Sequence, residues 1–424
     1  MTSRSARSSR PSEELVGAVH RDEWGRLLSL LVARTRRLDL AEDALGEAFA
    51  RAAARWPIEG VPANPAGWLY TTAHRQILGR LRAAAVAGRK APLLAVTADW
   101  QDPSPLDVEF ADERLHLILL CCHPALPRDS RSALALRLVI GTPTEQIARL
   151  FLVSTPTMAA RLTRAKKKIV AAGIPLGDPV AAALTERLDE VCRTIYLAFT
   201  AGYAPGTGAD LLRADLAADA VALAEVLRQV APSAPQARAL SALLILQHSR
   251  RDARQRGGRL VTLADQDRTR WHRDEIRQGL ELVSSLGPGE GYAEELRLQA
   301  MIAAAHARAS SGRDTDWAQI AEHYLALESL TGSAIVGLNR AVAVGEAHGP
   351  EAGLAVLAGL DAELRHHHRF AAVCGELAWR AGDLELAVSA FDAALDLCAN
   401  DAERSHLRHR SDEVRSAAAS SSSR

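Results

Sequence analysis

The side chains best suited to chemistry in this chain are the hydroxyl and basic groups of residues 154–170. At helical spacing, one apolar face would be formed by Met158, Leu162, Ala165 and Ile169. The polar side chains that would lie on the other faces are Thr157, Arg161, Arg164, Lys167 and Lys168. Arginine and lysine bind phosphate oxygens, and arginine and threonine also contact base edges. The pattern therefore predicts an amphipathic helix whose polar side binds nucleic acid.

The residues before this helix supply the other elements of a helix-turn-helix. Residues 132–140 are apolar at helical spacing, and Gly141 is expected to end that helix. Thr144 is expected to cap a second helix. The buried face of that helix would consist of Ile147, Ala148, Leu150 and Phe151. Ser154 would cap the basic helix, with Pro156 in its first turn. A helical hairpin with a solvated basic end is the alternative for this segment taken alone.

A second basic surface is predicted on a helix that begins at Asn64-Pro65. Its buried stripe would consist of Trp68, Leu69, Ala73, Ile77 and Leu81. Arg75, Arg80 and Arg82 would project from it, and no acidic residue occurs between Glu59 and Asp99. Positive charge beside aromatic rings suits the binding of single-stranded nucleic acid. Trp68 and Tyr70 could supply such rings, although a core position is the favoured reading of Trp68.

Three motifs follow one another along the chain, and their order and spacing resemble those of a known protein family. The first is Ala41-Glu42-Asp43-Ala44 with Glu47-Ala48-Phe49, the second is Asn64-Pro65 with Trp68-Leu69 and Ala73-His74-Arg75, and the third is the helix-turn-helix. Together they resemble the two conserved domains of sigma-70 family initiation factors of the extracytoplasmic-function type. The resemblance implies that the first motif docks on the polymerase clamp and that the second reads the −10 element. It implies that the third binds the −35 element and the polymerase flap.

The resemblance also implies roles for individual residues. Contacts with core RNA polymerase would be made by Glu42, Asp43, Glu47 and Phe49. Contacts with the −10 element would be made by Asn64, Trp68, Thr71, Arg75, Arg80 and Arg82. Contacts with the −35 element would be made by Thr155, Thr157, Arg161, Arg164, Lys167 and Lys168. Thr157 and Arg161 are the expected base readers, and the other cations, with Lys166, would bind phosphate. Gly79 stands where relatives often have Asp or Asn, which leaves the −10 sequence open. Gly46 replaces a common Gln in the clamp-docking helix, where a slightly weaker polymerase contact is expected.

Ordinary members of this class would end near Ile174-Pro175, whereas this chain continues to residue 424. Residues 184–286 resemble the helical extension of the sigma subgroup with a tetratricopeptide-like C-terminal region, although Thr200-Ala201 stands where relatives often have Asn-Glu. Residues 370–399 resemble one tetratricopeptide repeat, because small and bulky residues alternate as two closely packed helices require. Such solenoids offer a concave groove for peptides. We therefore expect a regulatory extension that binds a protein partner and replaces a separate membrane anti-sigma factor.

Composition and charge agree with a helical, DNA-binding protein. Charged residues make up 24% and aromatic residues 4% of the chain, and strand patterns are scarce. Net charge is zero, but residues 1–175 carry 25 Lys and Arg against 17 Asp and Glu, while residues 176–424 carry 26 against 34. A basic front suits nucleic acid, and an acidic rear could repel DNA, bind a basic partner or cover the front. No secretory segment or long apolar run is present, so a cytoplasmic protein without a membrane span is expected.

No pattern in the sequence favours catalysis, a metal or a cofactor. The five cysteines are odd in number and lack paired metal-ligand spacing, which is typical of a reducing compartment. Adjacent residues such as Cys121-Cys122 or His366-His367-His368 seldom chelate one ion together. The polar run of residues 264–272 favours buried ion pairs and caps, with a ligand pocket as the alternative. Phosphate loops, dinucleotide fingerprints and nucleophile elbows are missing from the sequence.

These observations predict an all-α protein. The expected order is a disordered tail at 1–12, sigma region 2 at 13–86, a linker at 87–108, sigma region 4 at 109–175, a helical extension at 176–290, a tetratricopeptide-like region at 291–412 and a disordered tail at 413–424. The expected function is promoter-specific initiation with core RNA polymerase. Two alternatives are a helix-turn-helix regulator that acts without polymerase and a repeat scaffold whose sigma core is vestigial.

Overall fold

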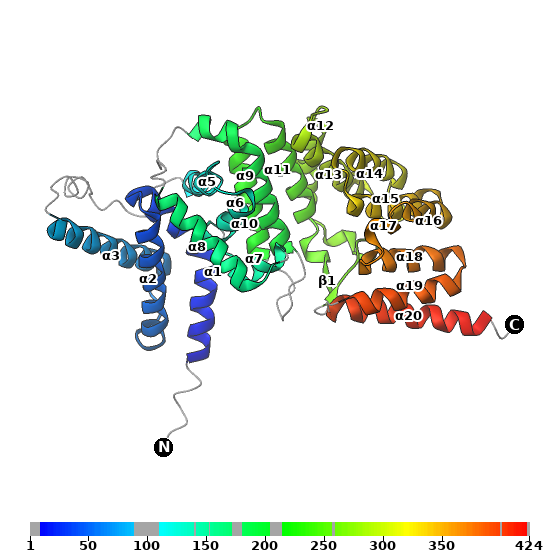
Figure 1. Cartoon of the computed structure of the whole chain (residues 1–424), viewed down its shortest axis with the longest axis horizontal. Coiled ribbons are helices and arrows are strands. Elements are labelled where there is room, and N and C mark those ends of the chain that lie inside the picture. Colours follow the sequence, from blue (N-terminus) through cyan, green and yellow to red (C-terminus); the bar gives the residue numbers. More distant parts are fainter. Residues whose placement is uncertain are drawn as a thin grey trace, which may run out of the picture. The chain divides into compact units, whose positions relative to one another are not determined.

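The computed structural model describes residues 9–88, 110–139, 141–151, 153–171, 180–203, 214–256, 259–398 and 401–421. The chain forms two compact units (Figure 1). The first comprises residues 1–203 and 213–232, and the second comprises residues 204–212 and 233–424. Among the described residues, the only strands are Gln255–Arg256 (β1) and Arg259–Leu260 (β2), which form a small antiparallel hairpin. The expectation of an all-α fold is confirmed.

The first unit begins with three helices packed on one another. They are α1 (Ser9–Thr35), α2 (Leu38–Glu59) and α3 (Pro65–Gly88). The turn between α1 and α2 uses Arg36 in the left-handed region at φ 53°, and its N–H donates to the carbonyl of Val32 at 2.7 Å. Leu31, Leu45 and Ile77, one from each helix, are fully buried. Removing these apolar side chains from water supplies most of the stability of such a bundle.

Four helices of the first unit contain the predicted helix-turn-helix. They are α5 (Phe110–Cys121), α6 (Arg128–Leu138), α7 (Thr144–Leu150) and α8 (Thr155–Ala171). The predicted apolar face of α8 is confirmed, because Met158, Leu162, Ala165 and Ile169 are all buried. Ser154 caps α8, since the N–H of Thr157 donates to its hydroxyl at 3.3 Å. The expected cap at Thr144 is wrong: Thr144 is the first residue of α7, and Pro143 precedes it without a side-chain cap.

Two further helices complete the first unit: α9 (Val180–Tyr203) and α10 (Ala214–Val230). Helix α9 packs against α5 and α6. The Ser132 hydroxyl lies 3.2 Å from the Glu190 carboxylate, and the Arg187 guanidinium donates to the carbonyl of Leu119 at 3.0 Å. The buried Cys122 thiol lies 3.7 Å from the Thr194 hydroxyl. Residues well beyond the helix-turn-helix therefore share its core.

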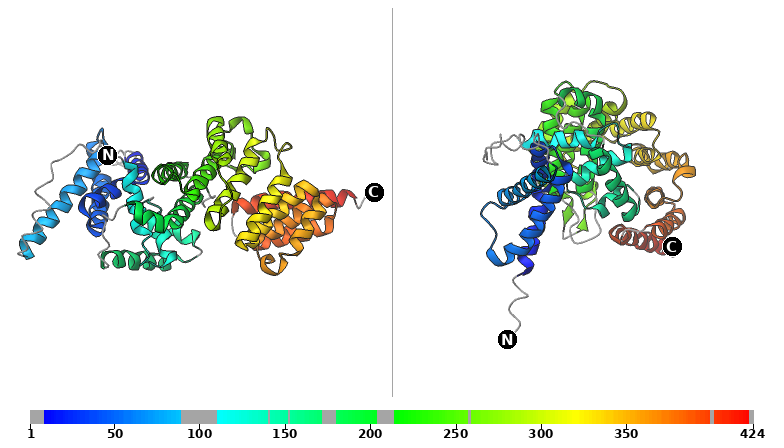
Figure 2. Two further views of the ribbon diagram at one scale, coloured as in Figure 1. Left: turned by 90° about the horizontal axis from the view of Figure 1, so that it is seen from above. Right: turned by 60° about the vertical axis from the view of Figure 1, so that its left-hand side comes forward.

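The second unit is an array of helices joined by short connections (Figure 2). Its α-helices are α11 (Pro235–His248), α12 (Arg273–Ser284), α13 (Gly291–Arg308), α14 (Trp317–Thr331), α15 (Ala334–His348), α16 (Pro350–Ala358), α17 (Asp361–Leu364), α18 (His368–Ala381), α19 (Leu384–Leu397) and α20 (Asp401–Ser421). Short 3-10 turns lie at η1 (Arg251–Ala253), η2 (Leu263–Asp265) and η3 (Arg268–Arg270). Successive helices pack on one another, as in helical repeat proteins.

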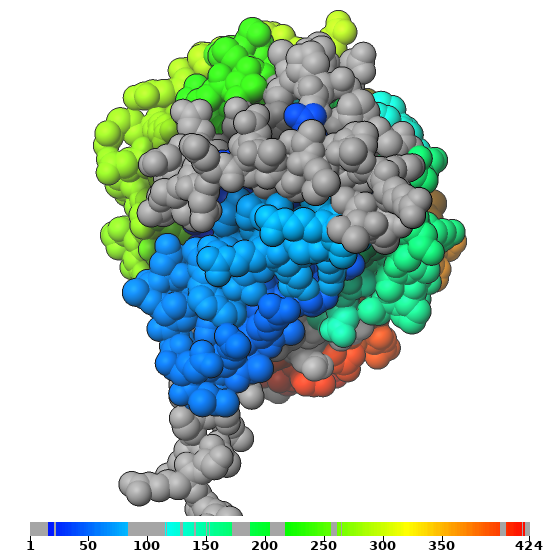
Figure 3. Space-filling model, turned by 90° about the vertical axis from the view of Figure 1, so that its left-hand side faces the viewer, coloured from blue at the N-terminus to red at the C-terminus, as the bar shows by residue number. Residues whose placement is uncertain are grey.

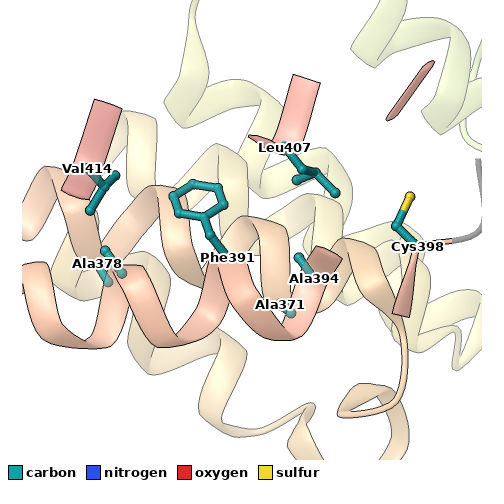
Figure 4. Close-up of a cluster of buried hydrophobic side chains, with 8 residues drawn as sticks. Ala371, Ala378, Phe391, Ala394, Cys398, Leu407 and Val414 are labelled. Carbon is teal, nitrogen blue, oxygen red and sulfur yellow. The ribbon is translucent and has the colours of Figure 1, made fainter. Parts of the chain in front are cut away.

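Helices α18 and α19 form the helix pair that the repeat pattern predicts. Gly382 ends α18 with φ 85°, a backbone conformation that suits glycine. A Cβ at Gly375 would lie 3.0 Å from the Phe391 ring, so glycine allows the two helices to approach closely. Phe391 is buried with Ala378, Leu407 and Val414 (Figure 4). The small residues of the motif therefore make room for one aromatic ring.

Several expected boundaries differ from the structure. The tail expected at 413–424 is helical through Ser421, because Val414 is fully buried against α18 and α19. The tail expected at 1–12 overlaps α1, which begins at Ser9. Helix α2 continues through Pro57 to Glu59 and ends at Gly60 with φ 88°. Most of the expected linker at 87–108 lies outside the described residues. No helix in the described part of the chain is long and apolar enough to cross a membrane.

Candidate nucleic-acid and polymerase interface

Helix α8 presents an exposed polar surface that begins at its capped end. Thr155 and Thr157 are exposed, and the Thr157 hydroxyl lies 2.8 Å from that of Ser154. Arg164 is exposed and donates from Nε to the carbonyl of Ala160 at 3.3 Å. Arg161 is half-buried, whereas Lys167 and Lys168 are exposed near the end of the helix. The structure thus brings the predicted −35 residues together along one helix whose apolar side is anchored in the core.

Helix α3, on the face shown in Figure 3, carries the residues predicted for the −10 element except Asn64, which precedes it. The Asn64 side-chain oxygen accepts the N–H of Gly67 at 2.8 Å, so Asn64 caps the helix. Trp68 is half-buried, and its ring meets that of Trp56 edge to face at a centroid distance of 5.6 Å. Thr71 is half-buried, while Arg75 and Arg82 are exposed. Asn64 therefore stabilises the start of α3, in addition to the contact with the −10 element that is expected of it.

Arg80 lies on the same helix but points toward α2. Its guanidinium forms an ion pair with Glu47 and lies 3.9 Å from the Asp43 carboxylate. The side chains involved are more than a third exposed, so the pairs stabilise the unit little. This arrangement joins one residue predicted to bind DNA to two residues predicted to bind polymerase.

The residues predicted for polymerase contact on α2 divide into two groups. Asp43 and Glu47 are exposed. Phe49 is 6% exposed, with its ring 4.8 Å from that of His20 and 5.9 Å from that of Trp24. The Phe49 ring is therefore mostly buried in the core and leaves little surface for the polymerase contact expected of it. Glu42 pairs with Lys166 of α8, with Nζ–Oε distances of 2.8 and 3.1 Å.

Two features of this surface were not predicted from the sequence. Ile58 is 85% exposed and Val61 is 37% exposed, although both are large apolar side chains. They flank the turn that leads from α2 into α3, next to the predicted −10 residues. Apolar residues that lie outside any helical stripe, between Pro57 and Pro62, were the available sequence signal. The pairing of Glu42 with Lys166 had no sequence signal, since 124 positions separate them.

The cysteine and histidine groups have structural surroundings. Cys121 and Cys122 are fully buried, and burial raises the pKa of Cys122 to about 12, which keeps its thiol protonated. The His123 ring accepts the N–H of Ala125 in a turn. The His367 ring caps α18 by accepting the N–H of Arg369. In the described part of the chain, no group of three or more potential ligands could hold a metal ion.

The polar run of residues 264–272 is built into the second unit by hydrogen bonds. The buried Arg268 guanidinium donates to the carbonyls of His306 and Ala309 at 2.6 and 2.8 Å and lies over the Trp271 ring. His272 pairs with Asp252 at 2.7 Å. These contacts form a structural network, which is the role that the sequence favours for residues 264–272. Tyr203 and Asp215 belong to the first unit, and Asp210 and Arg213 lie outside the described residues.

Comparison with known proteins identifies both halves of the interface. Residues 21–86 match the family "Sigma-70 region 2", and residues 116–169 match the family "Sigma-70, region 4". A protein of Rhizobium meliloti (strain 1021), described as uncharacterized, is 39% identical over 397 residues, which cover 91% of this chain and 93% of that protein. The chain belongs to the sigma-70 family. No solved structure shows significant similarity to it.

The matched regions of this sigma factor coincide with the helices described above. Region 2 covers just over half of α1 with α2 and most of α3, and region 4 covers the second half of α5 with α6, α7 and most of α8. Residues 187–286 match a family of unknown function (DUF6596), which includes residues of both compact units. The protein is an extracytoplasmic-function-like sigma factor for promoter recognition, with a C-terminal extension. Its sigma domains imply core RNA polymerase and promoter DNA as partners.

Proposed function

We propose that the exposed face of α8 reads the −35 element while the exposed face of α3 holds the −10 element. The observation that carries this assignment is the separation of each helix into a buried apolar stripe and a basic outer face. Thr157 and Arg161, near the capped start of α8, are assigned to base edges. Arg164, Lys167 and Lys168 are assigned to phosphates, where contacts position the protein without reading sequence.

On α3, we assign Arg75 and Arg82 to the displaced strand and Thr71 to a neighbouring nucleotide. Trp68 would support this surface from below through its contact with Trp56. The exposed Ile58 and Val61 would pack against an unstacked base at the entrance to α3. Asp43 and Glu47 are assigned to polymerase docking. We propose that the protein acts in the cytoplasm together with its polymerase. We propose no cofactor for it and no catalytic step of its own.

The assignment of α8 is tested by promoter binding and run-off transcription with purified core polymerase on the gene's own upstream region. Arg161→Ala should weaken binding by about 1–3 kcal/mol and relax selectivity at one −35 position. Lys168→Ala is the matched control: it should weaken binding to all sequences alike and lower the salt slope by about one. Equal loss of selectivity in both variants would contradict the division between base and phosphate contacts. Absence of any specific initiation by the unaltered protein would contradict the whole assignment.

We further propose that the helical array of the second unit regulates initiation by binding a protein partner. Its supports are the stacked helix pairs of α13–α20 and the acidic balance of residues 176–424. The first unit, residues 1–203 and 213–232, has its own core and provides the test. Truncation after Pro232 should change transcript levels but leave the preferred promoter sequence unchanged. An unchanged transcript level would overturn the regulatory role.

A further inference from the structure

The second unit contains an arginine that has no partner of opposite charge. Arg250 directly precedes η1 and is half-buried. Within the described residues, its guanidinium forms neither an ion pair nor a hydrogen bond. The next residue behaves differently, because Arg251 donates to both carboxylate oxygens of Glu275 at 2.8 Å. The fold therefore neutralises one of these two adjacent charges and leaves the other without a counter-ion.

The buried guanidinium of Arg268 lies close to Arg250 and to a third arginine. Burial lowers the pKa of Arg268, and the positive charges of Arg250 and Arg273 lower it as well. The hydrogen bonds of Arg268 go to two backbone carbonyls and to the Thr315 hydroxyl, none of which carries a charge. We call Arg250, Arg268 and Arg273 the arginine cluster. In the part of the chain that the structure describes, none of the three forms an ion pair.

This arrangement costs free energy unless an anion completes it. Buried cations lose their hydration, and neighbouring cations repel one another most strongly where water is scarce. The negative charge of Asp314 also acts on Arg268, but Asp314 is exposed and accepts hydrogen bonds from the hydroxyls of Ser310 and Ser311. A bound anion within reach of the arginine cluster would supply the missing negative charge.

Polar side chains without partners lie beside the same arginines. Burial, together with the charges of Arg250 and Arg268, lowers the pKa of His306 to about 4, so its ring is neutral at pH 7. The Trp271 ring centroid lies 4.7 Å from the guanidinium carbon of Arg268. Within the described residues, His306 Nδ1 and Trp271 Nε1 are both buried without a hydrogen-bond partner. Tyr324 is half-buried, and the charge of Arg250 opposes the rise that burial causes in its pKa. Buried polar atoms of this kind are places where a water or an ion is expected.

We propose that the arginine cluster binds the phosphate group of a small molecule. A phosphate carries about two negative charges and presents oxygens on several sides, so one group accepts hydrogen bonds from more than one guanidinium. A carboxylate carries one charge and would offset only one arginine. Because Arg268 is 7% exposed and Arg250 and Tyr324 are half-buried, the site suits a small group better than the broad surface of a nucleic acid. The ligand would bind where α13 packs on α11 and on α14 (Figure 1).

The site belongs to the second unit, and the inference is independent of the promoter and polymerase contacts proposed for α3 and α8. Binding is measured on the full-length protein without DNA or polymerase, by equilibrium dialysis against radiolabelled inorganic phosphate and against a radiolabelled nucleoside monophosphate. Sodium chloride holds the ionic strength constant. Saturable binding of both probes is expected. Tighter binding of the monophosphate would identify a phosphate ester as the ligand, and equal binding would show that the phosphate group alone is recognised.

Arg250→Gln tests the site without removing an ion pair or a hydrogen bond of the fold. It should weaken phosphate binding by at least about tenfold. In phosphate-free buffer it should also raise the urea midpoint of the second unit, because it removes a like charge beside Arg268. Arg365→Gln is the matched control, since it makes the same change at an exposed position directly after α17. It should leave both the phosphate affinity and the urea midpoint unchanged.

The imidazole proton resonances of His306 locate the bound phosphate. They are assigned by their absence in His306→Gln, and they should shift when phosphate is added to the unaltered chain but not when it is added to Arg250→Gln. The site would be overturned by no saturable binding of either probe, by equal affinity in Arg250→Gln and the unaltered chain, or by binding that leaves these resonances in place. Binding of duplex DNA that Arg250→Gln abolishes, without binding of either small probe, would overturn it in favour of a nucleic-acid surface.

Discussion

At the scale of single residues, some side chains predicted to contact DNA or polymerase also stabilise the fold. Phe49, expected at a polymerase contact, is buried between His20 and Trp24. Asn64, expected at the −10 element, caps α3 through the N–H of Gly67. A Cβ at Gly67 would lie 2.8 Å from the Asn64 amide nitrogen, so the two residues depend on each other. Effects of substitution on promoter binding must therefore be separated from effects on local order.

Asn64→Ala should loosen the first turn of α3. Loss of an N-cap side chain costs about 1 kcal/mol, so amide hydrogen exchange at residues 67–69 should speed up about fivefold. Asn64→Asp keeps an acceptor oxygen and should retain most of the protection. Exchange rates that are identical in Asn64→Ala and the unaltered chain would show that the cap does not hold this turn in solution.

At the scale of elements, the α18–α19 pair of the second unit is packed around a single aromatic ring in small-residue surroundings. Phe391 occupies the space that Gly375 and Ala378 leave between α18 and α19. Phe391→Ala should lower the free energy of unfolding of the second unit by about 3–5 kcal/mol. Leu386→Ala, on the same helix at a 40% exposed position, should change it by less than about 0.5 kcal/mol. Urea denaturation followed by circular dichroism measures both, and equal losses would contradict the assigned packing.

A buried histidine on α13 should make the stability of the second unit depend on pH. Burial, together with the positive charges of Arg250 and Arg268, lowers the pKa of His306 to about 4. The unfolded chain has an ordinary histidine pKa of about 6.5 and therefore binds the proton more readily below that pH. Stability should be constant above about pH 7 and fall by about 2 kcal/mol on acidification from pH 7 to 5.

The variant His306→Gln isolates this contribution. Because glutamine does not titrate, the stability difference between the unaltered chain and the variant should shrink on acidification by the same 2 kcal/mol or so. Urea denaturation at pH 7, 6 and 5 measures the difference. A constant difference across this range would show that His306 is protonated equally in the folded and unfolded states.

At the scale of the whole molecule, the extension begins inside the core of the DNA-binding unit. Helix α9 covers α5 and α6, and Cys122 is buried beside Thr194. A chain cut after Pro175 should therefore expose Cys122, whereas a chain cut after Pro232 should keep it buried. Thiol modification under native conditions should be at least about tenfold faster in the shorter chain. Equal protection in both chains would mean that α9 is dispensable for this core.

Local signals in the sequence determined the elements that carry function. Helical periodicity predicted the buried face of α8 and the buried Leu69, Ala73 and Ile77 of α3. Ser154 predicted the start of α8, and the small residues around Phe391 predicted the α18–α19 pair. These features depend on residues within a few turns of one another. For the same reason the fold class and the basic faces could be predicted, because both follow from which side of each helix is apolar.

Only the tertiary structure decided which surfaces remain free. Arg80 pairs with Glu47 across 33 positions, Cys122 meets Thr194 across 72, and Lys166 reaches Glu42 across 124. The burial of Phe49 and Val414 likewise depends on helices that lie far away in the chain or that local composition did not indicate. The two members of such a pair have no fixed separation in the sequence, because they meet when apolar faces of distant segments pack together and bring particular charges into contact. The sequence thus determined the helices and their chemistry, whereas packing decided which charged groups are paired within the molecule.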